Sequence, residues 1–209
     1  MKNFFYAIIR FLFNLVTYTW LGMQVVGEGH IPEKGAFIVA SNHASYFDPP
    51  LVGTAMRHHL IHFMAKEELF HNPFMGWFLR YVGTFPVHRG RVDRKALIEA
   101  LRVLKQGEVL GIFPEGTSRD QGKLGKFHEG MAAIAIRAQV PVLPTAIINS
   151  RHLPHKMGPV RVVFGNPVLP PVISRQDKEK ERDIIHEFSE DIRSRILDLI
   201  NQHGGENMS

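Results

Sequence analysis

A histidine followed five residues later by an aspartate is the most chemically suggestive pair in this chain. His43 and Asp48 come just after an apolar run that ends at Ala40, where a buried strand is expected to give way to a loop. Histidine exchanges a proton near neutral pH, and a carboxylate beside it can hold the ring in one tautomer and stabilise the imidazolium. The pair therefore predicts a general base. The alternative is a structural histidine, with Asp48 capping a helix that starts at Pro49.

The chain offers no obvious side chain for covalent catalysis beside this pair. It contains no cysteine, which excludes a thiol nucleophile, disulfides and a cysteine zinc site, and is compatible with a reducing cytoplasm. No Gly-x-Ser-x-Gly elbow is present, and Ser45 is more simply a turn residue. A base without a protein nucleophile indicates that a hydroxyl of the substrate attacks, which fits acyl transfer from an activated donor such as a thioester.

A second run, Phe113-Pro114-Glu115-Gly116-Thr117-Ser118-Arg119, also follows an apolar stretch and has the features of an anion site. The glycine allows close backbone approach, and the two hydroxyl residues supply donors. The arginine can grip a phosphate through a forked pair of hydrogen bonds. Glu115 lies within the run and has two interpretations: it accepts a hydrogen bond from a substrate hydroxyl, or it holds the loop through an arginine.

Two further cations are expected at strand ends. Arg89 follows a short strand-like run over 84–87, and Lys66 follows another over 62–65. Each can pair with a phosphate group. The chemistry indicated by the four polar fragments is therefore proton removal from an alcohol beside a site for an anion.

The elements that must position these residues alternate between strand and helix. Apolar periodicity predicts strands over 36–40, 62–65, 84–87, 109–113, 142–148 and 160–164. It predicts helices over 73–81, 93–105 and 129–138, and a long amphipathic helix that a capping box at Ser174 and Asp177 would start. This order argues for a single α/β domain with a mixed, mostly parallel central sheet covered by helices on both faces. The polar runs fall at strand ends, the usual place for chemistry in such folds.

The first 26 residues differ from the rest in being mostly apolar and aromatic. On a helix, Asn3, Arg10, Asn14 and Thr17 form one narrow polar stripe. Because Arg10 and Asn14 interrupt the run, it falls short of the roughly 20 uncharged residues that a spanning helix needs. We expect residues 1–26 to form an amphipathic helix or helix pair in the membrane interface, with the catalytic domain over 27–209. The alternatives are a terminal helix packed on the core or in a dimer, and a transmembrane span.

Charge and composition limit the classes of partner that the chain is expected to bind. The net charge is +5 and the pI about 9.6, which favours an anionic partner such as a phospholipid surface or a phosphorylated substrate. The basic residues are dispersed and show no RNA-recognition or zinc-finger signature, so nucleic acid is not expected. With 44% hydrophobic and 22% charged residues, the chain is expected to form a packed core.

Four fragments, taken in order, resemble the lysophosphatidic acid acyltransferase family, the bacterial 1-acylglycerol-3-phosphate acyltransferases. The first motif of that family, Asn-His-x-x-x-x-Asp with a serine inside, is matched by Asn42, His43, Ser45 and Asp48. The second, a glycine and an arginine six residues later, is matched by Gly83 and Arg89. The third is matched from Phe113 to Thr117, with Ser118 and Arg119 in swapped order. The fourth is matched by Val140, Pro141 and Pro144.

The resemblance implies an O-acyltransferase of phospholipid biosynthesis. It would move a fatty acyl group from acyl-CoA or acyl carrier protein to the sn-2 hydroxyl of 1-acyl-glycerol 3-phosphate, giving phosphatidic acid without an acyl-enzyme. His43 would be the base and Asp48 would orient it. The acceptor phosphate would be held by Arg89, Arg119 and Lys66, and the acceptor pocket shaped by Glu115, Gly116, Thr117 and Ser118.

The resemblance leaves some alternatives open. The acceptor could instead be glycerol 3-phosphate or a lyso-aminolipid, or the protein could be a catalytically silent membrane-binding protein on the same scaffold. No metal or cofactor is expected, since a thioester is already activated. The expected location is the cytoplasmic face of the cell membrane, as a peripheral or monotopic protein.

Two clusters have more than one interpretation. Three histidines lie close together in the sequence: His58, His59 and His62. The further ligands of a metal site are not apparent, so a solvated helix end is favoured. Four aromatic residues recur at helical spacing: Phe70, Phe74, Trp77 and Phe78. They indicate either core packing or the lining of an acyl-chain tunnel.

Overall fold

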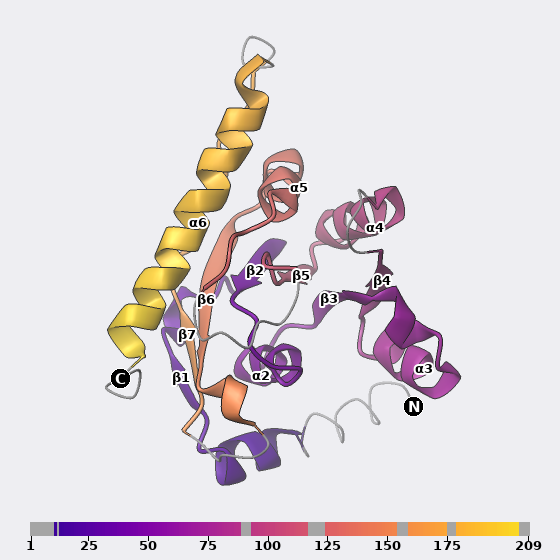
Figure 1. Cartoon of the computed structure of the whole chain (residues 1–209), viewed down its shortest axis with the longest axis vertical. Coiled ribbons are helices and arrows are strands. Elements are labelled where there is room, and N and C mark those ends of the chain that lie inside the picture. The colour runs from indigo at the N-terminus through magenta and orange to yellow at the C-terminus, as the bar shows by residue number, and fades with distance from the viewer. Residues whose placement is uncertain are drawn as a thin grey trace.

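A seven-stranded sheet organises the molecule (Figure 1). The structure is a computed structural model that describes residue 11 and residues 13–88, 93–116, 124–153, 159–174 and 179–204. The strands are β1 (Gln24–Val26), β2 (Phe37–Ser41), β3 (Ile61–Lys66), β4 (Phe85–Val87), β5 (Val109–Ile112), β6 (Val142–Ile148) and β7 (Arg161–Phe164). Their order across the sheet is β1-β7-β6-β2-β5-β3-β4.

The sheet is mixed and mostly parallel, as the sequence predicts. The five strands from β6 to β4 are parallel to one another. β7 pairs antiparallel with β6, and β1 pairs parallel with β7, so these two strands run against the rest, with β1 at the edge of the sheet. The carboxyl ends of β2, β5, β3 and β4 therefore share one edge of the sheet.

Helices cover both faces of the sheet. They are α2 (Asp48–Ala55), α3 (Pro73–Tyr81), α4 (Arg94–Lys105), α5 (Gly130–Ala138) and α6 (Glu181–His203), with short segments η1 (Val16–Trp20), η2 (Glu28–His30), η3 (Glu67–Phe70) and η4 (Ser150–His152). One core cluster joins the sheet to α4, α5 and α6, and a second joins its other face to α2. Alternate residues of β2 serve the two clusters: Ile38 faces the first and Val39 the second. In Figure 1, α6 runs along one side of the molecule and α3 lies at the opposite end.

The connections of two adjacent strands leave the sheet in opposite directions. The chain passes from β2 through α2 to β3, on one side of β2, whereas it passes from β5 through α5 to β6, on the other. In α/β sheets, ligands bind outside the carboxyl ends of the strands at such a switch point. The loop after β2 carries His43 and leads to Asp48, and the loop after β5 carries the run predicted to bind an anion.

The predicted elements agree with the structure over most of the domain. The helix over 73–81 and the strand over 142–148 have the expected bounds, and the other strands differ by about one residue at an end. The predicted capping box was wrong, because α6 begins at Glu181 after Lys180 at its N-cap, well beyond Ser174. Asp177 lies outside the described residues.

The sheet begins earlier than residue 27. Residues 24–26 form the edge strand β1, inside the segment expected to be helical. Two glycines with positive φ, Gly22 and Gly27, bracket the β-branched pair Val25 and Val26, so the local sequence favours a short strand. Gly27 is required where it stands, because a Cβ there would lie 2.2 Å from the carbonyl oxygen of Phe164.

The described part of the N-terminal segment is helical at residues 11 and 13–15 and continues into η1. Asn3 and Arg10, two members of the expected polar stripe, lie outside the described residues. None of the helices within the described ranges combines the length and the apolar character required to cross a bilayer.

Candidate active site

His43 and Asp48 meet where β2 gives way to α2. His43 lies in the loop after Ser41, and Asp48 is the first residue of α2, followed by two prolines that suit a first helical turn. The Nδ1 atom of His43 lies 2.9 Å from Oδ2 of Asp48. Both residues are buried, Asp48 completely. Because a carboxylate only accepts, Nδ1 carries the proton of this bond and Nε2 is left as the basic atom.

One oxygen of Asp48 also organises the loop. Its Oδ2 accepts the backbone N–H groups of Ala44 at 2.7 Å and Ser45 at 2.8 Å. The other oxygen, Oδ1, has no partner among the described residues. Asp48 therefore caps the loop that precedes α2, rather than the helix itself, while it orients His43. Ser45 is a turn residue as expected, since its Oγ accepts from the N–H of Phe47 at 3.2 Å.

Asn42 fixes the exit of the chain from β2. Its Nδ2 donates to the carbonyl of Ile147 and its Oδ1 accepts the N–H of the same residue, both at 2.8 Å. The side chain thus imitates a backbone unit and extends the pairing of β2 with β6 by one position. Sequence reasoning assigned Asn42 no role, because its partner lies on another strand far along the chain.

Glu115 links the loops after β2 and β5. It is almost fully buried; its Oε1 accepts the backbone N–H of His43 and its Oε2 accepts that of Gly125, each at 2.9 Å. It therefore holds the loop, but through backbone amides, and the arginine expected as its partner is not among the described contacts. Gly116 follows with φ 74°, and a Cβ there would lie 2.9 Å from Cδ2 of His128.

Two phenylalanines stack beneath the imidazole. The ring of Phe113 lies 4.2 Å from that of His43, with 21° between the planes. The ring of Phe63 lies 5.6 Å from that of Phe113, at 10°. Sequence reasoning gave neither ring a role, because Phe63 comes from β3 and only the strand order brings it to the site.

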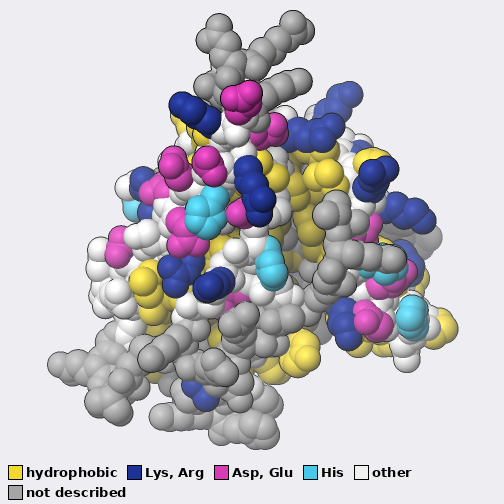
Figure 2. Space-filling view, turned by 45° about the horizontal axis from the view of Figure 1, so that its top comes forward, with side chains coloured by type: hydrophobic (Ala, Val, Ile, Leu, Met, Phe, Trp, Pro, Cys, Tyr) yellow, Lys and Arg dark blue, Asp and Glu magenta, His cyan; other side chains and the backbone are white. Residues whose placement is uncertain are grey.

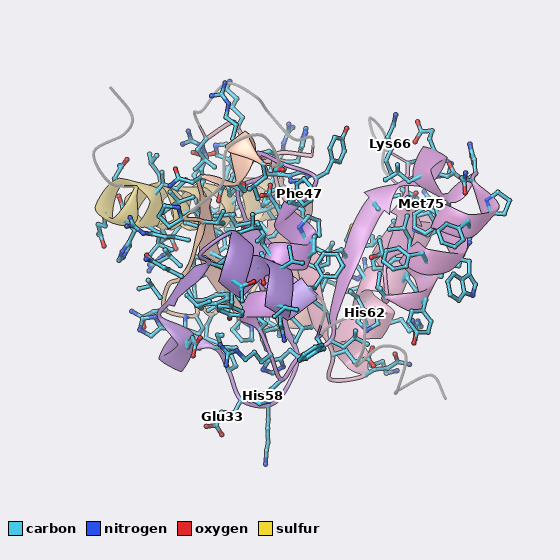
Figure 3. The ribbon with its side chains drawn as sticks, turned by 90° about the horizontal axis from the view of Figure 1, so that it is seen from below. Glu33, Phe47, His58, His62, Lys66 and Met75 are labelled. Carbon is cyan, nitrogen blue, oxygen red and sulfur yellow. The ribbon has the colours of Figure 1, made fainter. Side chains whose placement is uncertain are left out.

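The candidate phosphate-binding residues are only partly described. Lys66 ends β3, pairs with Val87 of β4 in register, and forms an ion pair with Glu68 at 3.2 Å. Its side chain is half-exposed. Figure 3 places Lys66, Phe47 and Met75 towards one side of the molecule and His58 at the opposite side. Four other expected site residues lie outside the described residues: Arg89, Thr117, Ser118 and Arg119.

The three histidines near α2 have separate environments. His58 is exposed, and His59 meets the ring of Phe37 edge-on. Burial is the main cause that lowers the pKa of His59 below its usual value. His62 bridges two elements, with Nδ1 2.9 Å from the carbonyl of Gly83 and Nε2 3.0 Å from Glu108. Within the described ranges, no group of three potential ligands is arranged for a metal.

The aromatic residues near α3 differ in how deeply they are buried. Phe70 is buried, but Phe74 is 74% exposed and Trp77 53% exposed, so core packing was the wrong interpretation for these two, and the lining of an acyl-chain tunnel stays a prediction. The helix buries Gly76 instead, because a Cβ there would lie 2.7 Å from the carbonyl oxygen of Phe70. That close contact turns the aromatic residues outward.

Charge is dispersed over the surface shown in Figure 2. Lys and Arg side chains are interspersed with Asp and Glu and do not gather into one patch on this face. A pocket of about 310 Å³ lies elsewhere, between the ends of β1 and β7 and the last turns of α6. None of the candidate site residues lines it.

A buried histidine–aspartate pair at the switch point of a mixed α/β sheet defines the class of protein. The family model described as Acyltransferase matches residues 22–148, more than half of the sequence, and the chain belongs to this family. It is accordingly an O-acyltransferase, as its sequence motifs predict.

Named relatives refine this assignment. A 1-acyl-sn-glycerol-3-phosphate acyltransferase of Bacillus subtilis is 30% identical over 150 residues, which cover 70% of this chain and 74% of the relative. A lyso-ornithine lipid O-acyltransferase of Pseudomonas aeruginosa is 35% identical over 132 residues, 63% of this chain and 50% of the relative. The crystal structure of the 1-acyl-sn-glycerophosphate acyltransferase of Thermotoga maritima matches with a TM-score of 0.68 and 32% identity, covering 91% of this chain and 79% of that one.

Proposed function

We propose that this enzyme acylates the sn-2 hydroxyl of 1-acyl-glycerol 3-phosphate with a fatty acyl group from acyl-CoA or acyl carrier protein. The observation that carries the proposal is the His43 imidazole, held at Nδ1 by Asp48 with Nε2 unpaired among the described residues. The names of the Bacillus subtilis and Thermotoga maritima relatives support this acceptor. The Pseudomonas aeruginosa relative favours a lyso-aminolipid as the second candidate.

His43 acts as base and then as acid in a single transfer. Nε2 removes the proton of the acceptor hydroxyl while its oxygen attacks the thioester carbonyl. The tetrahedral intermediate then expels the thiolate, which takes the proton back from Nε2, so no acyl-enzyme forms. Asp48 stabilises the imidazolium between these steps. A positioned base of this kind contributes about 10²–10⁴-fold in rate.

Cations at neighbouring strand ends hold the acceptor phosphate in this proposal. Lys66 ends β3, Arg89 follows β4, and Arg119 follows β5 in the sequence. The backbone and hydroxyls from Gly116 to Ser118 shape the acceptor pocket, and Glu115 maintains the loop on which they begin. Carboxyl ends of parallel strands lie at the same edge, which supports placing these groups around one ligand.

The partner surface in this proposal is a phospholipid membrane, met peripherally at its cytoplasmic face. The acceptor is a lipid, and the chain carries a net charge of +5. Exposed Phe74 and Trp77 on α3, together with Phe11 in the N-terminal segment, supply apolar side chains typical of a membrane interface. Such residues can enter the headgroup region while charged residues remain in water.

The proposed function is tested with His43→Ala. We expect turnover to fall by about 10²–10⁴-fold, measured as thiol release from acyl-CoA with 1-acyl-glycerol 3-phosphate, while circular dichroism stays unchanged. His58→Ala is the matched control, since His58 is exposed and lies on the side of the molecule opposite to Phe47 (Figure 3). A folded His43→Ala protein with full turnover would remove the proposed base. The same assay with glycerol 3-phosphate and a lyso-ornithine lipid identifies the acceptor.

A further inference from the structure

We propose that Phe113 is a positioning residue for the catalytic base, and that Phe63 supports it from β3. The inference rests on the proposed role of His43. Phe113 covers one face of the imidazole at 4.2 Å, with the ring planes 21° apart. The ring of Phe63 stacks with that of Phe113, with 5.6 Å between the ring centroids and 10° between the planes. The three rings form one stack that runs from β3 across the end of β5 to the loop after β2.

A glycine makes room for this stack of rings. Gly111 pairs with Phe63 across β5 and β3, and a Cβ on Gly111 would lie 2.3 Å from Cε1 of the Phe63 ring. The bare backbone therefore lets this ring lie across β5. Because side chains two residues apart share a face of a strand, Phe113 follows Gly111 on the same side and meets Phe63 there.

The stacked rings restrict the orientation of the His43 imidazole more than its hydrogen bond to Asp48 alone does. The bond from Nδ1 to Asp48 fixes one point of the imidazole, yet the ring can still tilt about that bond. An aromatic ring parallel to the imidazole removes this freedom, so Nε2 keeps a single direction. When His43 takes the acceptor proton, the resulting cation rests on the electron-rich face of Phe113, which is a favourable contact.

The first test separates turnover from binding. We expect Phe113→Leu to lower kcat about tenfold, with little change in the KM for 1-acyl-glycerol 3-phosphate, and Phe113→Tyr to restore most of the loss. Phe85→Leu is the control, because Phe85 is a phenylalanine of the sheet that is buried in the core on the other face, whereas Phe113 follows β5 and is partly buried. A Phe113→Leu enzyme with wild-type kcat, or one whose loss equals that of Phe85→Leu, would overturn the inference.

The second test does not depend on activity. In protein labelled with ¹³C at histidine Cε1, the resonance of His43 is the one that disappears in His43→Gln. A proton above a phenyl ring is shielded. We therefore expect the resonance of the Hε1 proton of His43, which is bound to the labelled carbon, to move downfield in Phe113→Leu and to stay in place in Phe85→Leu. An unmoved resonance would show that the rings do not stack. If instead His43→Ala retained turnover while the resonance moved, the proposed function would fail and the stack would stand.

Discussion

Glu115 joins two loops that the sheet would otherwise leave independent. It accepts one backbone N–H at His43, after β2, and another at Gly125, beyond the anion-site sequence that follows β5. A carboxylate offers two acceptors and no donor, so it can satisfy both amides at once. The contact couples the backbone of the proposed base to the loop that begins at Gly116.

We expect Glu115→Gln to lower the free energy of unfolding by about 1–3 kcal/mol, because the amide turns one acceptor into a donor that faces a buried N–H. Urea unfolding followed by circular dichroism measures the change. Glu129→Gln is the matched control, since Glu129 is partly exposed and contacts His186. Equal stability of Glu115→Gln and wild type would mean that the two loops keep their positions without the carboxylate.

Sequence alone predicts the local half of the site. His43 and Asp48 are separated by five residues, so one strand-to-helix turn suffices to bring them together. Glu115 is 72 positions from His43, and Ile147 is 105 from Asn42. Those contacts depend on which strands become neighbours, and no local pattern encodes that order.

At the scale of elements, α4 begins after an aspartate whose two carboxylate oxygens both accept hydrogen bonds. Oδ1 of Asp93 accepts the N–H groups of Lys95 and Ala96, and Oδ2 accepts the N–H and the Nδ1–H of His88. The hydrogen bond from the backbone of His88 is the largest cause that holds the pKa of Asp93 well below its usual value. His88 also contacts Glu67 of η3, so this histidine ties the start of α4 to the segment after β3.

We expect Asp93→Asn to cost about 1–3 kcal/mol of stability near neutral pH, because the amide places a donor against the N–H groups that His88 directs at Oδ2. Because the native pKa lies below the unfolded one, the carboxylate stabilises the fold above about pH 4 and loses this contribution as the pH falls towards the native pKa. The difference between wild type and variant should therefore shrink below pH 4 in thermal unfolding. Asp198→Asn, at an exposed site on α6, is the control. A difference that is independent of pH would contradict the role assigned to the carboxylate.

Periodicity predicts elements well and their surroundings poorly. The bounds of α3 and β6 follow from apolar spacing and flanking proline. The outward direction of Trp77 does not, because it depends on the contact between Gly76 and Phe70. β1 escapes prediction because three residues next to an apolar helical segment carry too little pattern to stand apart.

At the scale of the whole molecule, α3 provides a direct test of the proposed membrane contact. We expect the double variant Phe74→Ser and Trp77→Ser to reduce partition onto anionic phospholipid vesicles at least about tenfold, since each buried aromatic contributes about 1.5–3 kcal/mol. Co-sedimentation measures the partition. Ile98→Ser is the matched control, because Ile98 is 67% exposed on α4, across the sheet from α2.

The result should also appear in kinetics. The double variant is expected to raise the KM for acceptor embedded in vesicles and to leave turnover of detergent-dispersed acceptor unchanged. Vesicle partition equal to that of wild type would place the membrane contact elsewhere on the chain.

The chain leaves β2 and β5 in opposite directions, and this bears on how the acceptor specificity of the enzyme could be changed. The proposed proton-transfer pair belongs to the turn after β2, whereas the arginines proposed to bind the headgroup follow β4 and β5 in the sequence. In the proposed function, headgroup recognition and proton transfer therefore come from different stretches of chain. A loop graft that replaces the stretch after β4 is therefore expected to change the lipid acceptor and to spare the proposed acid–base chemistry, whereas a graft after β5 would also disturb the contact between Glu115 and His43.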